Sequence, residues 1–200
     1  MLVQGIALGF SIAAPVGPIG VLCIQRTLSR GRLSGFVSGL GAASADAVYG
    51  AIAGFGITTI SALLLDYRTG IRIGGGLLLL YLGVRSFRAE PVETAVSTSD
   101  VQGLASDCGS TFLLTITNPV TILAFVGIFT GLGVGVSGEY ADAAVLVTGV
   151  FLGSALWWFV LSAGVSLFRD RFTPPVLRRV NQFAGVVIGG FGLVALWSVW

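Results

Sequence analysis

Composition places this 200-residue chain in a lipid membrane, because 54% of its residues are hydrophobic, only 10% are charged and its mean hydropathy is +0.94. Its net charge of +2 is too small to mark a nucleic-acid-binding surface. Histidine and lysine are both absent, which excludes a Walker A loop and deprives a catalytic nucleophile of its usual bases, so we expect an integral membrane protein that is not an enzyme and holds no cofactor.

Six apolar segments lie between polar breaks, and each can cross a hydrocarbon layer about 30 Å thick as a helix. The pattern therefore predicts an all-α integral membrane protein with six transmembrane helices. The segments are 2–24, 35–65, 71–87, 108–136, 143–168 and 183–200.

The first segment is interrupted near its middle by the sequence Ala14-Pro15-Val16-Gly17-Pro18. Proline lacks a backbone N–H and clashes with the carbonyl one turn earlier, so Pro15 and Pro18 should break the helix and leave carbonyl groups unpaired. Such groups are tolerated inside a membrane only within protein or beside a water-filled cavity. Gly17 would let a ligand approach the backbone closely. We therefore expect Pro15, Gly17 and Pro18 to line a binding site.

The second segment contains a single ionisable residue between Gly35 and Leu65, Asp46. At about 1.5 Å per helical residue it lies roughly 16 Å from Gly35, near the centre of the hydrocarbon layer. A carboxylate there costs about 3 kcal/mol, so Asp46 should face a partner, a cavity or a bound cation. A structural acid bonded to Ser44 or to a neighbouring helix is the alternative. Tyr49 lies on nearly the same helical face and either contacts the acid, lines the cavity or simply packs.

Most of the 11 arginines lie on the first, third and fifth connections between segments, whereas the second and fourth carry only Arg68 and Arg72. Basic residues stay on the cytoplasmic side of a membrane. We therefore expect the odd-numbered loops in the cytoplasm and both termini outside. Trp157 and Trp158 are either interfacial anchors or residues packed between helices.

Residues 88–107 form the only polar stretch of any length, and their Pro, Ser, Thr and acidic residues suit a cytoplasmic linker. This stretch divides the chain into a first three-helix repeat, 1–87, and a second, 108–200. Because each half would cross the membrane three times, the second must enter from the opposite side. The two halves are thus predicted to form an inverted repeat.

The first helix of the second half is interrupted at Thr117-Asn118-Pro119, the place that corresponds to the break in the first half. Transporters use such pairs of broken helices as binding sites. A simple kink is the alternative for either break taken alone. The two matched breaks and the buried acid together favour a substrate and ion site, to which Thr117 and Asn118 add polar side chains beside Pro119.

Glycines recur at a spacing of four residues in several segments, which lets helices pack closely. Such stripes serve contacts within one protomer or between two, so a homodimer stays open. The stripes are Gly31, Gly35 and Gly39; Gly50 and Gly54; Gly70 and Gly74; Gly149 and Gly153; and Gly185 and Gly189.

The sequences APVGP, GRLSGFVSGLGAASAD and ITNPVTIL resemble those of the LysE/RhtB superfamily of amino-acid exporters, and the likeness extends over the whole chain. The resemblance implies a secondary transporter in the bacterial inner membrane that exports amino acids or related small metabolites, coupled to protons. In such a carrier Asp46 would exchange a proton or pair with a substrate ammonium group. The first break, from Pro15 to Pro18, would bind the substrate carboxylate, and Thr117 with Asn118 would complete the polar lining. The identity of the substrate stays open.

Two other classes of membrane protein remain as alternatives. Cys23 and Cys108 lie toward corresponding ends of the two halves, as a thiol-disulfide relay would need, although neither has a second cysteine in C-x-x-C spacing. A divalent-metal transporter would need a fuller set of ligands than one buried acid and two scattered thiols.

Overall fold

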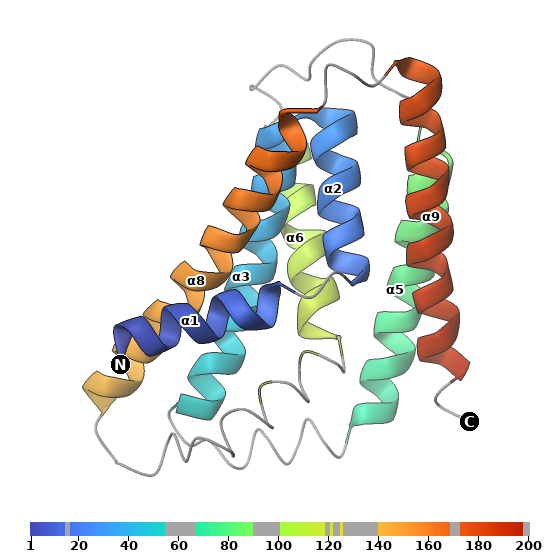
Figure 1. Cartoon of the computed structure of the whole chain (residues 1–200). Helices are drawn as coiled ribbons and strands as arrows, with labels where there is room; N and C mark the ends of the chain where they lie inside the picture. Colours follow the sequence, from blue (N-terminus) through green and yellow to red (C-terminus); the bar gives the residue numbers. More distant parts are fainter. Residues whose placement is uncertain are drawn as a thin grey trace.

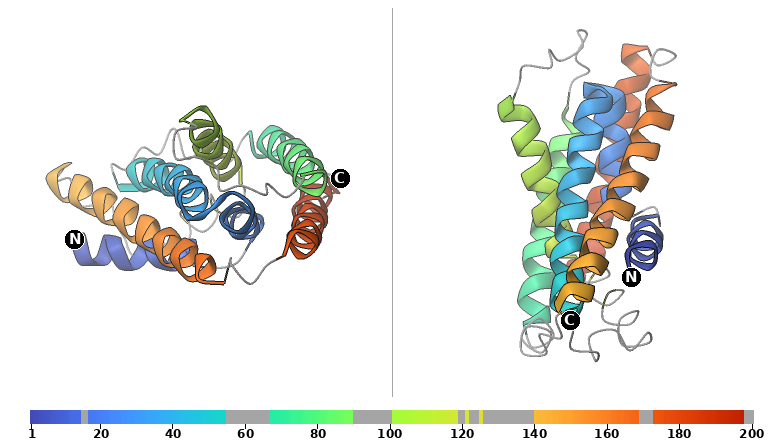
Figure 2. Two further views of the ribbon diagram at one scale, coloured as in Figure 1. Left: turned by 90° about the horizontal axis from the view of Figure 1, so that it is seen from above. Right: turned by 90° about the vertical axis from the view of Figure 1, so that its left-hand side faces the viewer.

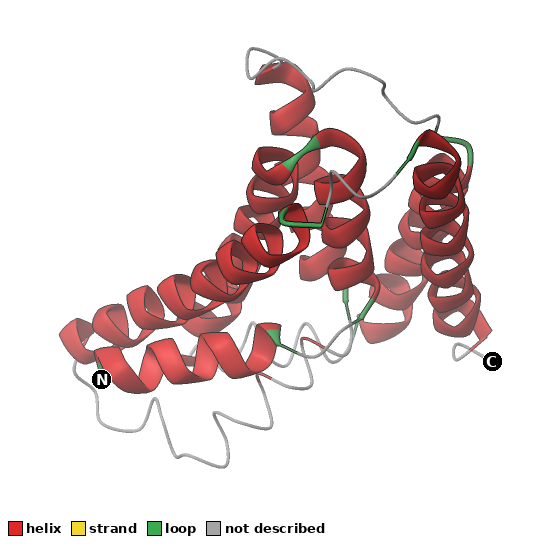
Figure 3. Cartoon of the chain, turned by 45° about the horizontal axis from the view of Figure 1, so that its top comes forward, coloured by secondary structure: helices red, strands yellow, loops and turns green. Residues whose placement is uncertain are grey.

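The computed structural model describes residues 1–14, 17–54, 67–89, 101–118, 121, 125, 140–168 and 173–197. Within these ranges the regular structure is helical throughout (Figure 3). The helices are α1 (Leu2–Ala13), α2 (Pro18–Arg30), α3 (Arg32–Gly54), α5 (Arg68–Phe87), α6 (Val101–Ile116), α8 (Tyr140–Ser166) and α9 (Pro174–Trp197).

Three of these helices, α3, α8 and α9, are long and apolar enough to cross a membrane. The bent pair formed by α1 and α2 is a fourth candidate, and the apolar part of α5, Ile73–Phe87, is shorter. The prediction of an all-helical, multi-pass membrane protein is therefore confirmed. Most of the predicted segment 108–136 beyond Asn118 lies outside the described residues.

The predicted interruption of the first helix is confirmed. α1 ends at Ala13, α2 begins at Pro18, and the two helices are bent by 83° with respect to each other. Pro18 takes the first turn of α2, where its missing N–H needs no partner and its fixed φ suits a helix. Gly17 precedes it in an extended conformation, with φ −120° and ψ −165°. Pro15 lies outside the described residues.

The long helices form a bundle, and α1 packs along α8 but lies at a steep angle to α2 (Figure 1). α3 packs against α8 and α6, whereas α5 packs against α9. Seen from above, α5 and α9 lie side by side at one flank, and α2 stands between this pair and α3 (Figure 2). The main apolar core includes Cys23, Ala43, Leu82, Trp158 and Ile188, so it extends from the α3–α8 pair through α2 to the flank.

Helices α6 and α9 begin well before their predicted apolar segments at the arginine-rich end of the bundle. α6 begins at Val101, inside the polar stretch 88–107, and α9 begins at Pro174, ahead of the predicted residue 183. The added turns contain Asp107 of α6 and Asn181 of α9, which are 2% and 0% exposed. Hydropathy does not detect these turns, because it scores their polar side chains as exposed. These side chains are buried because they have hydrogen-bond partners inside the bundle.

α1 and α8 approach each other through glycines. A Cβ atom added to Gly9 would lie 2.0 Å from the Val150 carbonyl oxygen, and one added to Gly153 would lie 2.0 Å from the Ile6 carbonyl oxygen. A Cβ added to Gly149 would lie 2.5 Å from the Leu2 carbonyl oxygen and 2.8 Å from the Cα of Gly5. The predicted close packing at Gly149 and Gly153 is confirmed, and the opposing glycines of α1 explain how it is achieved.

The other stripes differ from one another. A Cβ added to Gly185 would lie within 3.0 Å of the α5 backbone, as the spacing predicts. By contrast, a Cβ added to Gly70, Gly74 or Gly189 would meet nothing within 4 Å among the described residues, so close packing at these three glycines stays a prediction.

Replacing Gly153 by alanine is expected to lower the free energy of unfolding by about 1–3 kcal/mol, because the new methyl group would push α8 away from the backbone of α1. Thermal unfolding of the detergent-purified protein would measure this loss. Gly164→Ala is the matched control on the same helix: its methyl group meets open space, so helix propensity should leave stability unchanged or raise it by up to about 1 kcal/mol. Equal losses in the two variants would contradict the close approach.

Candidate functional site

Asp46 is 3% exposed and faces α8. Its Oδ2 accepts a hydrogen bond of 2.7 Å from the Ser154 hydroxyl, and Ser154 in turn accepts one of 3.2 Å from the Trp158 indole Nε1. The described ion pairs both involve Asp107, so none of the described residues gives Asp46 a cationic partner. A buried carboxyl group held by one neutral hydroxyl can still take up a proton or a cation.

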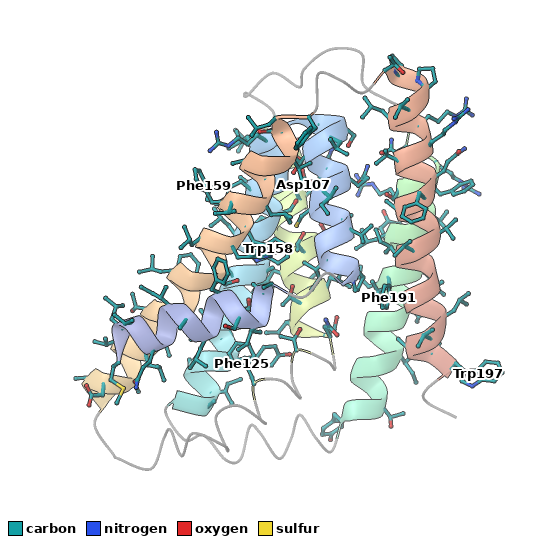
Figure 4. The ribbon with its side chains drawn as sticks, in the orientation of Figure 1. Asp107, Phe125, Trp158, Phe159, Phe191 and Trp197 are labelled. Atoms are coloured by element: carbon teal, nitrogen blue, oxygen red, sulfur yellow. The ribbon has the colours of Figure 1, made fainter. Side chains whose placement is uncertain are left out.

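The structure identifies the hydrogen-bond partner of Asp46, which the sequence leaves open between Ser44 and a neighbouring helix. The Ser44 hydroxyl donates to the Leu40 carbonyl oxygen of its own helix, so the partner of Asp46 comes from the neighbouring helix. Trp158 is 4% exposed and packs between helices (Figure 4), and the Trp157 ring contacts Phe10 edge to face. Ser154 is a functional candidate that sequence reasoning missed, because no local pattern pairs residues 108 positions apart.

Tyr49 does not bond to Asp46. Its hydroxyl donates to the Ile116 carbonyl oxygen, at the last residue of α6, and its ring lies 5.6 Å from that of Phe125. Tyr49 therefore ties α3 to the start of the second predicted break, which makes it a packing residue with its hydroxyl satisfied.

The second predicted break begins where α6 ends, at Ile116. The Thr117 hydroxyl donates to the Leu113 carbonyl oxygen at 2.7 Å, and the Asn118 backbone N–H donates to the Thr115 carbonyl oxygen at 3.1 Å. On the other side, a Cβ added to Gly75 of α5 would lie 2.8 Å from the Thr117 carbonyl oxygen. The end of α6 is thus enclosed by α3 and α5, whereas Pro119 lies outside the described residues.

The first predicted break is open at Gly17. A Cβ added there would meet nothing within 4 Å among the described atoms, and its φ is one that any residue can adopt. The space beside Gly17 therefore does not depend on glycine. Among the described contacts, Asp46 meets Ser154, and Tyr49 meets the residue before Thr117, but none joins Gly17 or Pro18 to Asp46 directly.

Replacing Tyr49 by phenylalanine is expected to cost about 1–3 kcal/mol of stability, because the half-buried Ile116 carbonyl group loses its side-chain donor. The measurement is thermal unfolding of the purified variant. Tyr81→Phe provides the control. Tyr81 is 61% exposed, so removal of its hydroxyl group should leave stability nearly unchanged. A loss no greater than that of the control would contradict the assigned hydrogen bond.

A second buried polar group lies at the arginine-rich end, and sequence reasoning missed it. Asp107 of α6 accepts hydrogen bonds of 2.6–2.8 Å from Arg30 and one of 2.6 Å from the Ser34 hydroxyl, and its Oδ1 lies 3.4 Å from Arg26 Nε. Figure 4 shows Asp107 near the end of the bundle. The contacts come from α2, α3 and α6 together, so this cluster joins three helices.

Arg26 is the most completely bound cation of this cluster. Its side chain is 7% exposed, and its terminal nitrogens donate to the Ser38, Thr111 and Ser110 hydroxyl groups and to the Asp107 carbonyl oxygen. In the sequence, Arg26 and Arg30 belong to the arginines of the first connection between segments, which indicate topology. Helical spacing could have distinguished Arg26 and Arg30 from loop arginines, because residues four positions apart lie on the same face of a helix.

The residues of the two alternative functions are also described. Cys23 is completely buried and Cys108 is half-buried, and both are free thiols. In the described part of the chain no three His, Cys, Asp or Glu side chains are grouped so that they could hold a metal ion.

The chain was compared with known proteins. A model of the LysE type translocator family matches residues 10–198. A Bacillus subtilis (strain 168) protein provisionally named an amino acid efflux protein is 28% identical over 94% of this chain and 90% of its own length. An uncharacterized membrane protein of Escherichia coli (strain K12) is 30% identical over 85% and 77%, and the threonine efflux protein of the same strain is 27% identical over 88% of both chains. No solved structure matches the chain.

Proposed function

The chain belongs to the LysE type translocator family, and from this premise we propose that it is a proton-coupled secondary transporter that exports amino acids or related small metabolites across the bacterial inner membrane. The family match over nearly the whole chain is the observation that carries the proposal. The buried Asp46 supports it, because a carboxyl group without a described cationic partner suits a proton or an ammonium group better than a purely structural role.

Six spans in two inverted repeats are the architecture that we propose, with 1–87 and 108–200 as the repeats and 88–107 as the region between them. Two pairings support it: α3 packs against α8 and α5 against α9, and each pair joins helices that hold corresponding places in the two halves. The break between α1 and α2 and the end of α6 at Ile116 also hold corresponding places.

The proposed orientation puts the arginine-rich end in the cytoplasm and both termini outside. Arg30, Arg85 and Arg88 lie at the upper ends of α2 and α5 in Figure 1, and Arg178 with Arg179 at the upper end of α9, which agrees with the positive-inside rule. Relatives from three bacterial groups are named as membrane proteins, which supports a bacterial membrane.

In the proposed mechanism the binding site lies between the two breaks and Asp46. Asp46 binds a proton in one state and releases it as the substrate ammonium group takes its place in the other. Backbone groups around Pro15, Gly17 and Pro18 bind the substrate carboxylate, with Thr117, Asn118 and Pro119 on the opposite side. Tyr49 holds the end of α6 in position for this site.

The proposed function is tested by efflux of radiolabelled amino acids from cells that express the protein, compared with cells that carry an empty vector. Threonine is the first substrate to test, because a relative that this chain matches over 88% of its length is named a threonine efflux protein. Expected is faster efflux of at least one amino acid and its loss when a protonophore is added. Equal efflux with and without the protein for a panel of all amino acids would overturn the proposal.

A further inference from the structure

A cavity of about 220 Å³ opens between α2 and α5 at the arginine-rich end, away from Asp46 and the two breaks. Two leucines, Leu22 and Leu82, form its apolar part. Its polar lining consists of Gln25, Arg26, Ser29, Arg30, Arg85 and Ser86.

The charges around this cavity do not balance. Three arginines line it, whereas the one described carboxylate bound to any of them, Asp107, contacts Arg26 and Arg30 from outside the lining. Arg85 is exposed and has no described carboxylate within ion-pair distance. Among the described residues the cavity therefore has an excess of positive charge that a ligand anion would neutralise.

Ser86 gives a second, independent indication of a ligand. It is 5% exposed, it lines the cavity, and its hydroxyl has no hydrogen-bond partner among the described residues. A buried hydroxyl without a partner costs about 1–3 kcal/mol, so a ligand group that accepts a hydrogen bond from Ser86 would be stabilising.

The lining is held in place by its own hydrogen bonds. Gln25 Nε2 donates to the Asn181 Oδ1 at 2.9 Å and to the Ser29 hydroxyl at 3.2 Å, and Asn181 Nδ2 donates to the Ala89 carbonyl oxygen at 3.1 Å. Asn181 is completely buried and so joins α2, α9 and the end of α5 around the cavity. The wall formed by Gln25, Ser29 and Ala89 is thus in place before any ligand binds, which lowers the cost of binding there.

The volume limits the ligand to a small molecule. A water molecule takes about 30 Å³ in the liquid, and drug-sized ligands occupy pockets of about 300–1,000 Å³. About 220 Å³ accommodates a carboxylate with a short side chain, and the two leucines offer an apolar surface beside the charged groups.

We propose that this cavity binds the carboxylate of a small amino acid through Arg85, Ser86 and Arg30, as a waiting site at the arginine-rich end before transport. The proposal rests on the proposed function for its choice of ligand. Arg30 already binds Asp107, so a bound carboxylate would compete with Asp107 for its guanidinium group. The site is separate from Asp46, so each can be removed without the other.

Arginine labelling with phenylglyoxal tests the site without transport. The detergent-purified full chain is labelled with and without L-threonine, and peptide mass spectrometry follows Arg85 and Arg88. L-threonine is expected to slow labelling of Arg85 and not of Arg88, which is exposed and outside the lining. L-threonine amide, in which the carboxylate is neutral, is expected to protect neither residue. Equal labelling of Arg85 with and without L-threonine would overturn the proposal, and so would protection by short-chain phosphatidylglycerol alone, which would assign the cavity to a lipid phosphate.

A transport assay separates this proposal from the proposed function. In cells that export threonine, Arg85→Gln is expected to raise the half-saturating internal concentration about tenfold, as the loss of one charge-assisted hydrogen bond predicts, with Arg88→Gln unchanged. Export that is normal in Arg85→Gln would overturn the waiting site and leave the function standing. Protection of Arg85 without export of any amino acid would overturn the function and leave a carboxylate site.

Discussion

Asp46→Asn is expected to abolish proton-coupled efflux while the protein still folds. Asparagine has nearly the same shape and can still accept the hydrogen bond from Ser154, but it can neither release a proton nor carry a negative charge. A charge-assisted hydrogen bond is worth about 1.5–3 kcal/mol, so loss of the contact with a substrate ammonium group alone lowers affinity roughly 10- to 150-fold. Efflux from cells with matched amounts of the two proteins, with and without a protonophore, measures the effect.

Ser154→Ala is the control that separates a transport role of Asp46 from a structural one. It removes the same hydrogen bond from the other side and leaves the carboxyl group in place. If Asp46 acts through its proton and charge, Ser154→Ala retains protonophore-sensitive efflux and Asp46→Asn does not. Similar activity of both variants, whether high or low, would reduce Asp46 to a structural acid.

Asp107→Asn is expected to destabilise the folded protein by about 3–5 kcal/mol, the usual cost of removing one partner from a buried ion pair. The variant leaves Arg26 buried with a positive charge and no described carboxylate, while Arg30, whose side chain is 27% exposed, can turn toward water. Thermal unfolding in detergent would show the loss as a lower midpoint.

The companion variants identify the source of the loss. Asp142→Asn replaces an acid in the first turn of α8 and is expected to cost at most about 1 kcal/mol through the helix dipole. Adding Arg26→Gln to Asp107→Asn removes the unpaired buried charge and should restore part of the stability. A double variant less stable than Asp107→Asn would contradict an unpaired charge as the cause.

The sequence predicts the helices well where apolarity and proline decide them. The helical membrane class and the break before Pro18 are confirmed, since both depend on local chemistry. The partners of Asp46 and Tyr49 depend instead on how α3 meets α8 and α6, and no local pattern contains that information. From the sequence, Ser154 is one of several hydroxyl residues in an apolar segment, and nothing there marks it as the partner of Asp46.

Arg26 shows what the topology rule leaves out about a charged residue. Arginine near the end of an apolar segment usually marks the cytoplasmic side, and the topology rule counts it without asking whether it is buried. Arg26 is instead 5% exposed, because Asp107 of a distant helix and three hydroxyl groups compensate its burial. Asp107 was not identified from the sequence either, because it is the last residue of the polar stretch 88–107, whose composition suits a linker.

The Arg26–Asp107 contact also sets an order for biogenesis. The ribosome completes Asp107 81 residues after Arg26, a delay of roughly 4–16 s at the usual pace of about 5–20 residues per second. Throughout this interval the newly inserted Arg26 has no Asp107 and must reach water or lipid headgroups with its long side chain. The first half of the protein therefore cannot reach its final packing during its own synthesis, and its maturation awaits a helix of the second half.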